Sequence, residues 1–159
     1  MISALAIASQ FIQLGIEQNK PVTPMKLQKL VYLAHGIHLA RFDAPLINEE
    51  IEAWSYGPVI PIVYDTFKSW GNRPITEPAE IGVRIGRVFQ SHLDVFTNDV
   101  DETIQIAWDI GKDLSGTQLS NWSHSMDSPW QKTYTAGWNK KIRRDLIRDY
   151  FRETMKINA

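Results

Sequence analysis

Two histidines lie three positions apart in an apolar stretch, a spacing that can support metal chemistry. On a helix, His35 and His38 would share one face, where two imidazoles can reach the same ion. A zinc site needs further ligands at the same point. The sequence has no cysteine and no HExxH-type signature. We therefore predict no metal site, and expect one packed histidine and one surface histidine.

A serine, a histidine and an aspartate lie close together near residue 125. Ser123, His124 and Asp127 are the residue types of a hydrolase triad. Neighbours in sequence seldom reach triad geometry, however, and the chain lacks the G-x-S-x-G elbow that exposes a nucleophilic serine. We favour a histidine at a helix end that is bonded to backbone carbonyl groups.

Paired acids and spaced glycines give no stronger indication of catalysis. The acids at 49–50 and 101–102 are adjacent, so their side chains diverge on either a helix or a strand. Gly111 and Gly116 have phosphate-loop spacing, but Thr-Gln follows them instead of Lys-Ser or Lys-Thr. No enzyme hypothesis is favoured, and we predict a non-enzymatic protein.

Charge is unevenly distributed along the chain, although the formal net charge is only −1. Residues 94–113 contain six acids and one lysine, and residues 139–156 contain seven bases and three acids. These segments either face each other or each face a partner. The basic segment is the one nucleic-acid candidate, through Arg143, Arg144, Arg148 and Arg152. The acids within it favour a solvated helix face, so nucleic acid is a disfavoured partner.

Length and composition indicate one soluble domain over residues 1–159. The absence of cysteine excludes disulfides and fits a reducing compartment. The apolar N-terminus has recurring polar residues, which favours an amphipathic helix over a signal peptide. No run approaches the roughly 20 apolar residues of a membrane span. We expect a cytoplasmic protein without a membrane partner.

Periodicity and capping signals predict a mainly α fold with about six helices and a small antiparallel β element. Thr23 and Pro24 are a good start for the longest helix, and Ser115 with Gln118 fits a capping box. Gly71 is placed to end a helix in a left-handed conformation. The expected helices cover 2–18, 24–42, 57–71, 99–114, 115–126 and 140–156, with a strand at 47–54 and a weaker strand pattern at 83–89.

The densest group of aromatic residues lies directly before a Gly-Pro pair that interrupts regular secondary structure. Trp54 and Tyr56 come directly before Gly57 and Pro58, which we expect to start a helix. Large aromatic side chains are costly to leave in water and are often buried in a partner. The same residues could instead wedge two elements of the fold together, and the sequence leaves both interpretations open.

The order of several motifs resembles the SocA-like antitoxin family, also called the Panacea domain, which includes prophage-associated GepA-like proteins. The similar stretches are Met25–Ala34, Pro45-Leu46, Glu52–Val59 with the pattern E-A-W-x-Y-G-P-V, Val63–Phe67 and Leu119–Trp130 with a Ser-His pair and a later Pro-Trp. The resemblance covers about residues 22–130. At Trp122 the chain has a bulky aromatic where we expected a smaller residue such as Thr or Leu.

The resemblance implies an antitoxin of a bacterial or prophage toxin–antitoxin system that neutralises its toxin by direct binding. It implies no catalytic residue, no cofactor and a mainly helical domain. Alternatives of the same fold are an adaptor that delivers its partner to a protease and a phage counter-defence protein. A third alternative is a nucleic-acid-binding regulator that uses the basic C-terminal helix. The oligomeric state is not indicated.

The expected protein-binding surface follows from the aromatic pattern and the second motif. Buried aromatic anchors contribute much of the binding energy in protein interfaces. The predicted residues are Trp54, Tyr56, Gly57, Pro58, Tyr64, His124 and Trp130. If these residues are structural, the acidic 94–113 segment is the alternative toxin-binding face.

Overall fold

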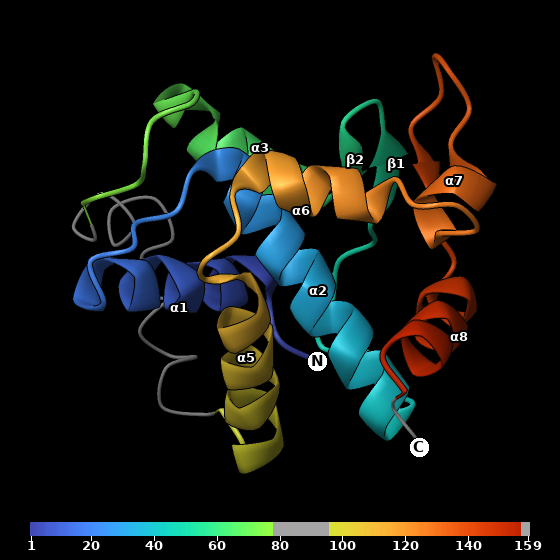
Figure 1. Cartoon of the computed structure of the whole chain (residues 1–159), viewed down its shortest axis with the longest axis horizontal. Coiled ribbons are helices and arrows are strands. Elements are labelled where there is room, and N and C mark those ends of the chain that lie inside the picture. Colours follow the sequence, from blue (N-terminus) through green and yellow to red (C-terminus); the bar gives the residue numbers. More distant parts are fainter. Residues whose placement is uncertain (78–95, 157–159) are drawn as a thin grey trace.

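The computed structural model describes residues 1–77 and 96–156 and is mainly helical in these ranges (Figure 1). The helices are α1 (Ala4–Glu17), α2 (Pro24–Phe42), α3 (Pro61–Phe67), the 3-10 helix η1 (Lys68–Trp70), α5 (Asn98–Gly111), α6 (Gly116–Ser123), α7 (Pro129–Thr133) and α8 (Arg144–Thr154). The strands are β1 (Glu52–Trp54), β2 (Gly57–Val59) and β3 (Lys140–Lys141). The predicted fold class, mainly α with a small antiparallel sheet, is confirmed.

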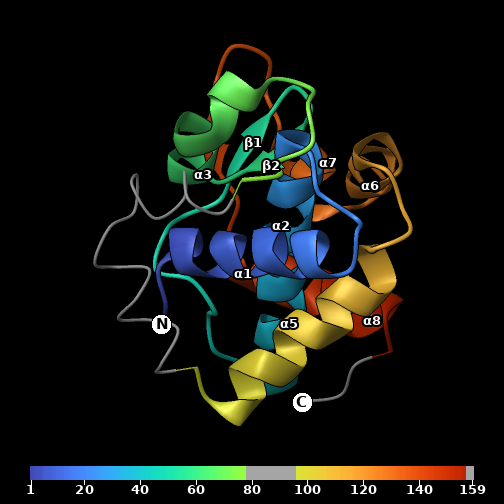
Figure 2. The same cartoon turned by 90° about the vertical axis from the view of Figure 1, so that its left-hand side faces the viewer.

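Helix α2 lies at the centre of the fold. It contacts α1, α3, α5, α6, α8 and β2, and the two views place it between α5 and α8 (Figures 1 and 2). Every residue from Lys26 to Ala40 is buried. A helix that is enclosed on all sides has no polar face of the kind that surface helices show. The other elements are therefore positioned by how they pack on α2.

Local capping chemistry sets several helix starts. The Thr23 hydroxyl accepts a hydrogen bond from the Lys26 amide, and Pro24 occupies the first turn of α2. Ser115 and Gln118 form the predicted capping box at α6. These interactions satisfy amide groups that have no partner within the helix, and they depend on nearby residues alone.

The sheet has the order β2-β1-β3, with both pairings antiparallel. Strands β1 and β2 form a hairpin in which Trp54 pairs with Gly57 across the two-residue turn Ser55-Tyr56. Strand β3 comes from far along the chain and pairs with the other side of β1. Pro58 is accommodated because β2 is an edge strand, where a missing amide donor breaks no ladder hydrogen bond.

Some predicted boundaries were wrong. Gly57 and Pro58 lie in β2, and the following helix begins at Pro61. Lys140 and Lys141 belong to β3, so the last helix begins only at Arg144. In both cases residues that fit a local helical pattern instead form a strand that pairs with β1. The strand expected at 83–89 lies outside the described residues.

Three helix ends also differed from expectation. The Thr97 hydroxyl caps α5 by accepting from the Val100 amide, so the helix begins at Asn98, one residue before the expected start at 99. Gly71 ends η1 with a φ of 60° but a ψ of −119°, so its φ is positive as predicted while its conformation is not the left-handed helical one. Helix α6 ends at Ser123, three residues earlier than expected.

The bulky Trp122 fits an aromatic cluster between α2, α6 and α8. Its ring lies 6.0 Å from the Tyr32 ring and 5.8 Å from the Phe151 ring, measured between centroids. Phe151 is fully buried and also packs on Gly36 of α2. The larger residue is therefore accommodated by an edge-to-face aromatic arrangement.

The contact between Gly36 and Phe151 predicts a sharp steric effect. A Cβ atom at residue 36 would lie 2.3 Å from the Phe151 ring. We expect Gly36→Ala to lower the free energy of unfolding by about 1–3 kcal/mol, the usual cost of overpacking. Denaturant unfolding measures it. Adding Phe151→Leu should cost less in the Gly36→Ala background than in the wild type. Additive effects of the two substitutions would contradict this packing.

Candidate functional site

The seven residues predicted for the interface gather around the β1–β2 hairpin. Trp54 ends β1, Tyr56 lies in the turn, and Gly57 and Pro58 form most of β2. Tyr64 projects from α3, while His124 and Trp130 belong to the ends of α6 and α7. The two sequence motifs, separated by more than 60 residues, thus meet at one small hairpin.

Side chains from α6 and α7 hold one side of the hairpin by its backbone. The Trp130 indole Nε1–H donates to the Trp54 carbonyl at 2.6 Å, and the Ser120 hydroxyl donates to the Tyr56 carbonyl at 2.9 Å. His124 Nε2 lies 3.3 Å from the Ser55 carbonyl oxygen. The His124 ring also packs on Trp130, with 4.0 Å between ring centroids. His124 and Trp130 therefore position the hairpin.

Helix α2 holds the hairpin from the other side. The Lys29 amine donates to the Pro58 carbonyl at 3.0 Å. The Gln28 side chain makes two bonds to Ile60, accepting from its amide at 2.9 Å and donating to its carbonyl at 3.2 Å. These bonds supply partners for backbone groups that a three-residue edge strand leaves unpaired.

Gly57 is required at its position for two reasons. Its φ of +115° is a conformation that residues with a side chain rarely adopt. A Cβ atom there would also lie 2.8 Å from the Ser123 hydroxyl and 3.0 Å from the end of Lys29. The glycine thus allows the hairpin to approach α2 and α6 closely. This role is structural and does not require a partner.

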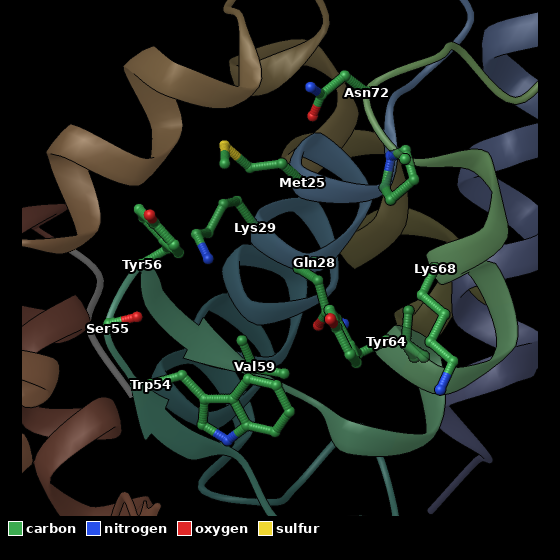
Figure 3. Close-up of a pocket in the computed structure, with 13 residues that line it drawn as sticks. Met25, Gln28, Lys29, Trp54, Ser55, Tyr56, Val59, Tyr64, Lys68 and Asn72 are labelled. Atoms are coloured by element: carbon green, nitrogen blue, oxygen red, sulfur yellow. The ribbon is translucent and has the colours of Figure 1, made fainter. Parts of the chain in front are cut away.

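An apolar pocket of about 290 Å³ opens between α2, the hairpin and α3 (Figure 3). Its walls include Met25 from α2, Val59 from β2 and Val63 from α3. Trp54 and Tyr64 pack edge-to-face across it, with 5.1 Å between ring centroids. The Trp54 indole donates to the Glu52 carboxylate, so its ring orientation is fixed. The pocket thus has aromatic and aliphatic walls, and its lining also includes the polar side chains of Gln28 and Lys29.

The predicted residues fall into two groups at this pocket. Trp54, Tyr56 and Tyr64 line it, and Tyr56 and Tyr64 are 73% and 44% exposed. His124 and Trp130 do not line it and act on the hairpin backbone instead. The structure thus separates residues that line the pocket from residues that contact the hairpin backbone.

Sequence reasoning missed Lys29 and Gln28. Both lie within a stretch whose pattern predicts a buried helix, and both line the pocket. Lys29 is only 1% exposed, and burial lowers its pKa from 10.5 to about 8. Polar residues that interrupt an otherwise apolar helix were the available signal, because buried polar groups need defined partners.

The two histidines of α2 are both buried, against the expectation of one surface histidine. His35 Nδ1 accepts from the Leu46 amide, and burial lowers the His35 pKa to about 3. His38 Nδ1 contacts the Thr103 hydroxyl at 3.1 Å. Thr103 donates its own hydrogen to the Asp99 carbonyl, so His38 is the donor to Thr103. In the described residues, no three His, Asp or Glu side chains are placed to hold a metal.

The Ser123, His124 and Asp127 group does not have the geometry of a triad. The Ser123 hydroxyl donates to the Ser120 carbonyl at 2.7 Å, and His124 Nδ1 lies 2.6 Å from the same oxygen. A carbonyl only accepts, so Nδ1 carries a proton and is not a base for Ser123. This matches the expected helix-end histidine bonded to backbone carbonyls.

The arginines of the basic segment are engaged within the fold. Arg148 pairs with Asp43 at 2.8 Å, and Arg152 donates to the Ala40 carbonyl at 2.9 Å. Arg144 donates to the Asn48 carbonyl. Among the ion pairs of residues 1–77 and 96–156, none joins this segment to the acidic 94–113 segment. Within the part of the chain that the structure describes, the two charged segments thus form no ion pair with each other.

The sequence model for "Antitoxin SocA-like, Panacea domain" matches residues 27–131, a range that includes both motifs at the hairpin. The chain belongs to this SocA-like antitoxin family. The Antitoxin SocA of Caulobacter vibrioides (strain NA1000 / CB15N) is 30% identical to the chain over 162 residues, covering 95% of this chain and 83% of that protein. No solved structure matches the chain.

The family match and the hydrophobicity of the helices describe different properties of the chain. The Panacea-domain match includes most of α2, the hairpin and α3, the elements that build the pocket, and it also includes α6. Across residues 1–77 and 96–156, no helix combines the length and hydrophobicity needed to cross a bilayer.

The Trp130 bond to the hairpin predicts a stability effect that differs between tryptophans. Trp130→Phe keeps an aromatic ring but leaves the Trp54 carbonyl without its donor, and we expect a loss of about 1–3 kcal/mol in unfolding free energy. Trp138→Phe is the matched control, because Trp138 is 65% exposed and surface changes usually cost less than about 0.5 kcal/mol. Equal losses in denaturant unfolding would contradict the role given to Trp130.

The lowered pKa of Lys29 predicts a stability that rises with pH. Between pH 8 and 10.5 only the unfolded state holds this proton, so the burial penalty is relieved as pH rises. Urea unfolding measures this effect against the Lys29→Met variant. Between pH 7 and 9.5 the unfolding free energy of the wild type should rise by about 1–2 kcal/mol relative to that of the variant. The range stays below pH 10 because burial raises the Tyr32 pKa, so ionisation of Tyr32 in the unfolded state opposes the gain. If the unfolding free energies of the two proteins change in parallel with pH, the lowered pKa of Lys29 is contradicted.

Proposed function

We propose that this Panacea-domain protein is an antitoxin that neutralises a cognate toxin by direct protein–protein binding. Support comes from its family and from a relative named as an antitoxin. In this proposal the protein acts as one domain and through occupancy of the toxin, without catalysis. The toxin-binding face is the mouth of the apolar pocket beside the β1–β2 hairpin.

The observation that carries this assignment is a group of exposed apolar side chains around the pocket mouth. Met25, Tyr56 and Tyr64 are 38%, 73% and 44% exposed, and all three line the pocket. Large apolar groups gathered at a concave site mark interaction surfaces more often than scattered ones do. Tyrosine in particular is enriched among the residues that dominate binding energy.

In the proposed complex the seven predicted residues have two different roles. Trp54, Tyr56 and Tyr64 would contact the toxin directly. Gly57, Pro58, His124 and Trp130 would keep the hairpin at the position from which Tyr56 projects. Loss of the second group should therefore lower stability and binding together, whereas loss of an exposed aromatic should lower binding alone.

A nucleic-acid-binding regulator is the weaker candidate. Phosphate contacts need basic side chains that are available to the ligand. Arg148 and Arg152 already bond Asp43 and the Ala40 carbonyl, and Arg144 bonds the Asn48 carbonyl. A protease adaptor would use the same toxin-binding face, and it differs in that the bound toxin would be degraded.

The function is tested first by growth. Each neighbouring gene is expressed alone and together with this protein, and colony growth is scored. We expect one neighbour to stop growth and this protein to restore it, with purified toxin and antitoxin forming a complex. The toxin level during rescue separates the mechanisms, since a blocker leaves it unchanged and an adaptor lowers it. Absence of any rescued neighbour would contradict the proposal.

Tyr56→Ser gives the sharpest residue-level test of the binding face. Tyr56 is the most exposed of the pocket aromatics, so its removal should leave the unfolding free energy within about 0.5 kcal/mol. We expect toxin affinity to fall at least about tenfold, as for an interface hot spot, with weaker rescue of growth.

Trp138→Ser is the matched control for Tyr56→Ser, because it removes an aromatic of similar exposure that is not part of the pocket lining. It should bind the toxin like the wild type. If both variants bind equally well in calorimetry, the toxin meets another face.

A further inference from the structure

The pocket at the proposed toxin-binding face has basic groups and no acidic ones in its lining. Lys29 and Lys68 line it, and no aspartate or glutamate does among the described residues. Lys68 lies toward solvent, 3.6 Å from Asp65, whereas Lys29 lies inside (Figure 3). The formal net charge of the chain is −1, so this basic lining is a local feature.

Lys29 is an incompletely satisfied donor. Its side chain lies among the pocket residues with the amine turned toward the hairpin (Figure 3). An ammonium group has three N–H donors, and within residues 1–77 and 96–156 its one hydrogen-bond acceptor is the Pro58 carbonyl. No carboxylate of these residues pairs with it. A buried cation without a counter-charge is unfavourable, and a carboxylate beside it would remove that penalty.

The size of the pocket limits what can enter. A volume of about 290 Å³ lies at the lower end of ligand pockets and suits one side chain or a chain end. The aliphatic and aromatic walls suit an apolar group, while the amine suits an anion. The occupant that satisfies both is an apolar group with an adjoining carboxylate.

We propose that the pocket receives an apolar side chain of the cognate toxin together with a neighbouring carboxylate, which pairs with the Lys29 ammonium. This inference rests on the proposed antitoxin function and names the chemistry of its recognition. A protein segment fits better than a free metabolite because the exposed apolar rim of Met25, Tyr56 and Tyr64 extends the surface beyond the pocket. Such a rim excludes water around a central anchor.

The central test uses the toxin that the growth experiment identifies, with calorimetry on full-length proteins. Lys29→Met removes the charge with little change in side-chain length. We expect its toxin affinity to fall at least about 30-fold, as when one partner of a buried charge pair is truncated. Because Lys29 also holds Pro58, thermal unfolding confirms that the variant is folded at the assay temperature.

A second pair of variants leaves Lys29 intact. Ser55 lines the pocket and is exposed, so a longer side chain there reaches solvent without displacing core residues. Ser55→Glu and Ser55→Gln add similar bulk and differ in charge. A carboxylate-bearing occupant should bind the Glu variant at least about tenfold more weakly than the Gln variant, because like charges at a binding site repel each other.

The outcomes separate this inference from the function on which it rests. If the wild type binds the toxin but Lys29→Met matches it and the two Ser55 variants agree, the carboxylate is overturned and the antitoxin function stands. If the wild type does not bind the toxin, both fail. If Lys29→Met is unfolded, the Ser55 pair alone decides.

A small probe identifies the source of the carboxylate. 3-Phenylpropionate and its neutral amide are titrated into isotope-labelled protein while the Trp54 indole signal is followed by NMR. We expect the acid to bind at least about tenfold more tightly than the amide, and the toxin to displace it. A bound acid that the toxin does not displace would assign the pocket to a free carboxylic acid and overturn the proposal.

Discussion

A helix that is buried on every side must satisfy its polar side chains inside the protein, and this constraint organises the whole fold. On α2, Gln28, Lys29 and His35 bond backbone groups near the hairpin and at Leu46. Lys26 bonds the Lys112 carbonyl at the end of α5. Leaving such groups unpaired would cost more than the bonds gain, so the surrounding elements have little freedom to shift.

The same constraint acts on the β1–β2 hairpin, which forms part of the proposed toxin-binding face. A hairpin with three-residue strands is too short to be stable by its own ladder. It persists because α2 holds Pro58, α6 holds the Tyr56 carbonyl and α7 holds the Trp54 carbonyl. The donors bond backbone atoms only, so they leave the outward side chains Trp54 and Tyr56 free to form a surface. A rigid support beneath exposed aromatics lowers the entropic cost of binding.

In the proposed complex Lys29 would have both roles, holding the hairpin and recognising the toxin. Its bond to Pro58 helps to hold the hairpin, but burial of its charge is unfavourable and lowers its pKa. Proteins keep such groups at functional sites more often than elsewhere. In the proposed complex the toxin carboxylate would provide the missing counter-charge, so the stability lost in the free antitoxin would return as binding energy.

The helices whose signals are local could be predicted from the amino-acid sequence alone. The capping residues Thr23 and Ser115 and the apolar run of 24–42 predicted α2 and the start of α6 correctly, since a cap and a period involve residues within a few positions of each other. The resemblance to the family was also carried by sequence. The residues of the candidate site were named as a group, and the fold does bring them together.

The contacts that each of those residues makes, in contrast, depend on long-range pairing and burial. Gly57-Pro58 forms a strand and not a helix start because β1 is available to pair with it, and β1 pairs in turn with β3 from residues 140–141. Trp130 bonds the Trp54 carbonyl and the His124 ring lies against the Ser55 carbonyl, both some 70 positions away, a relation that no local pattern contains. The burial of Lys29 depends on the hairpin closing over α2. Long-range pairing and burial are set by the whole chain, which is why the pocket and its amine appeared only with the fold.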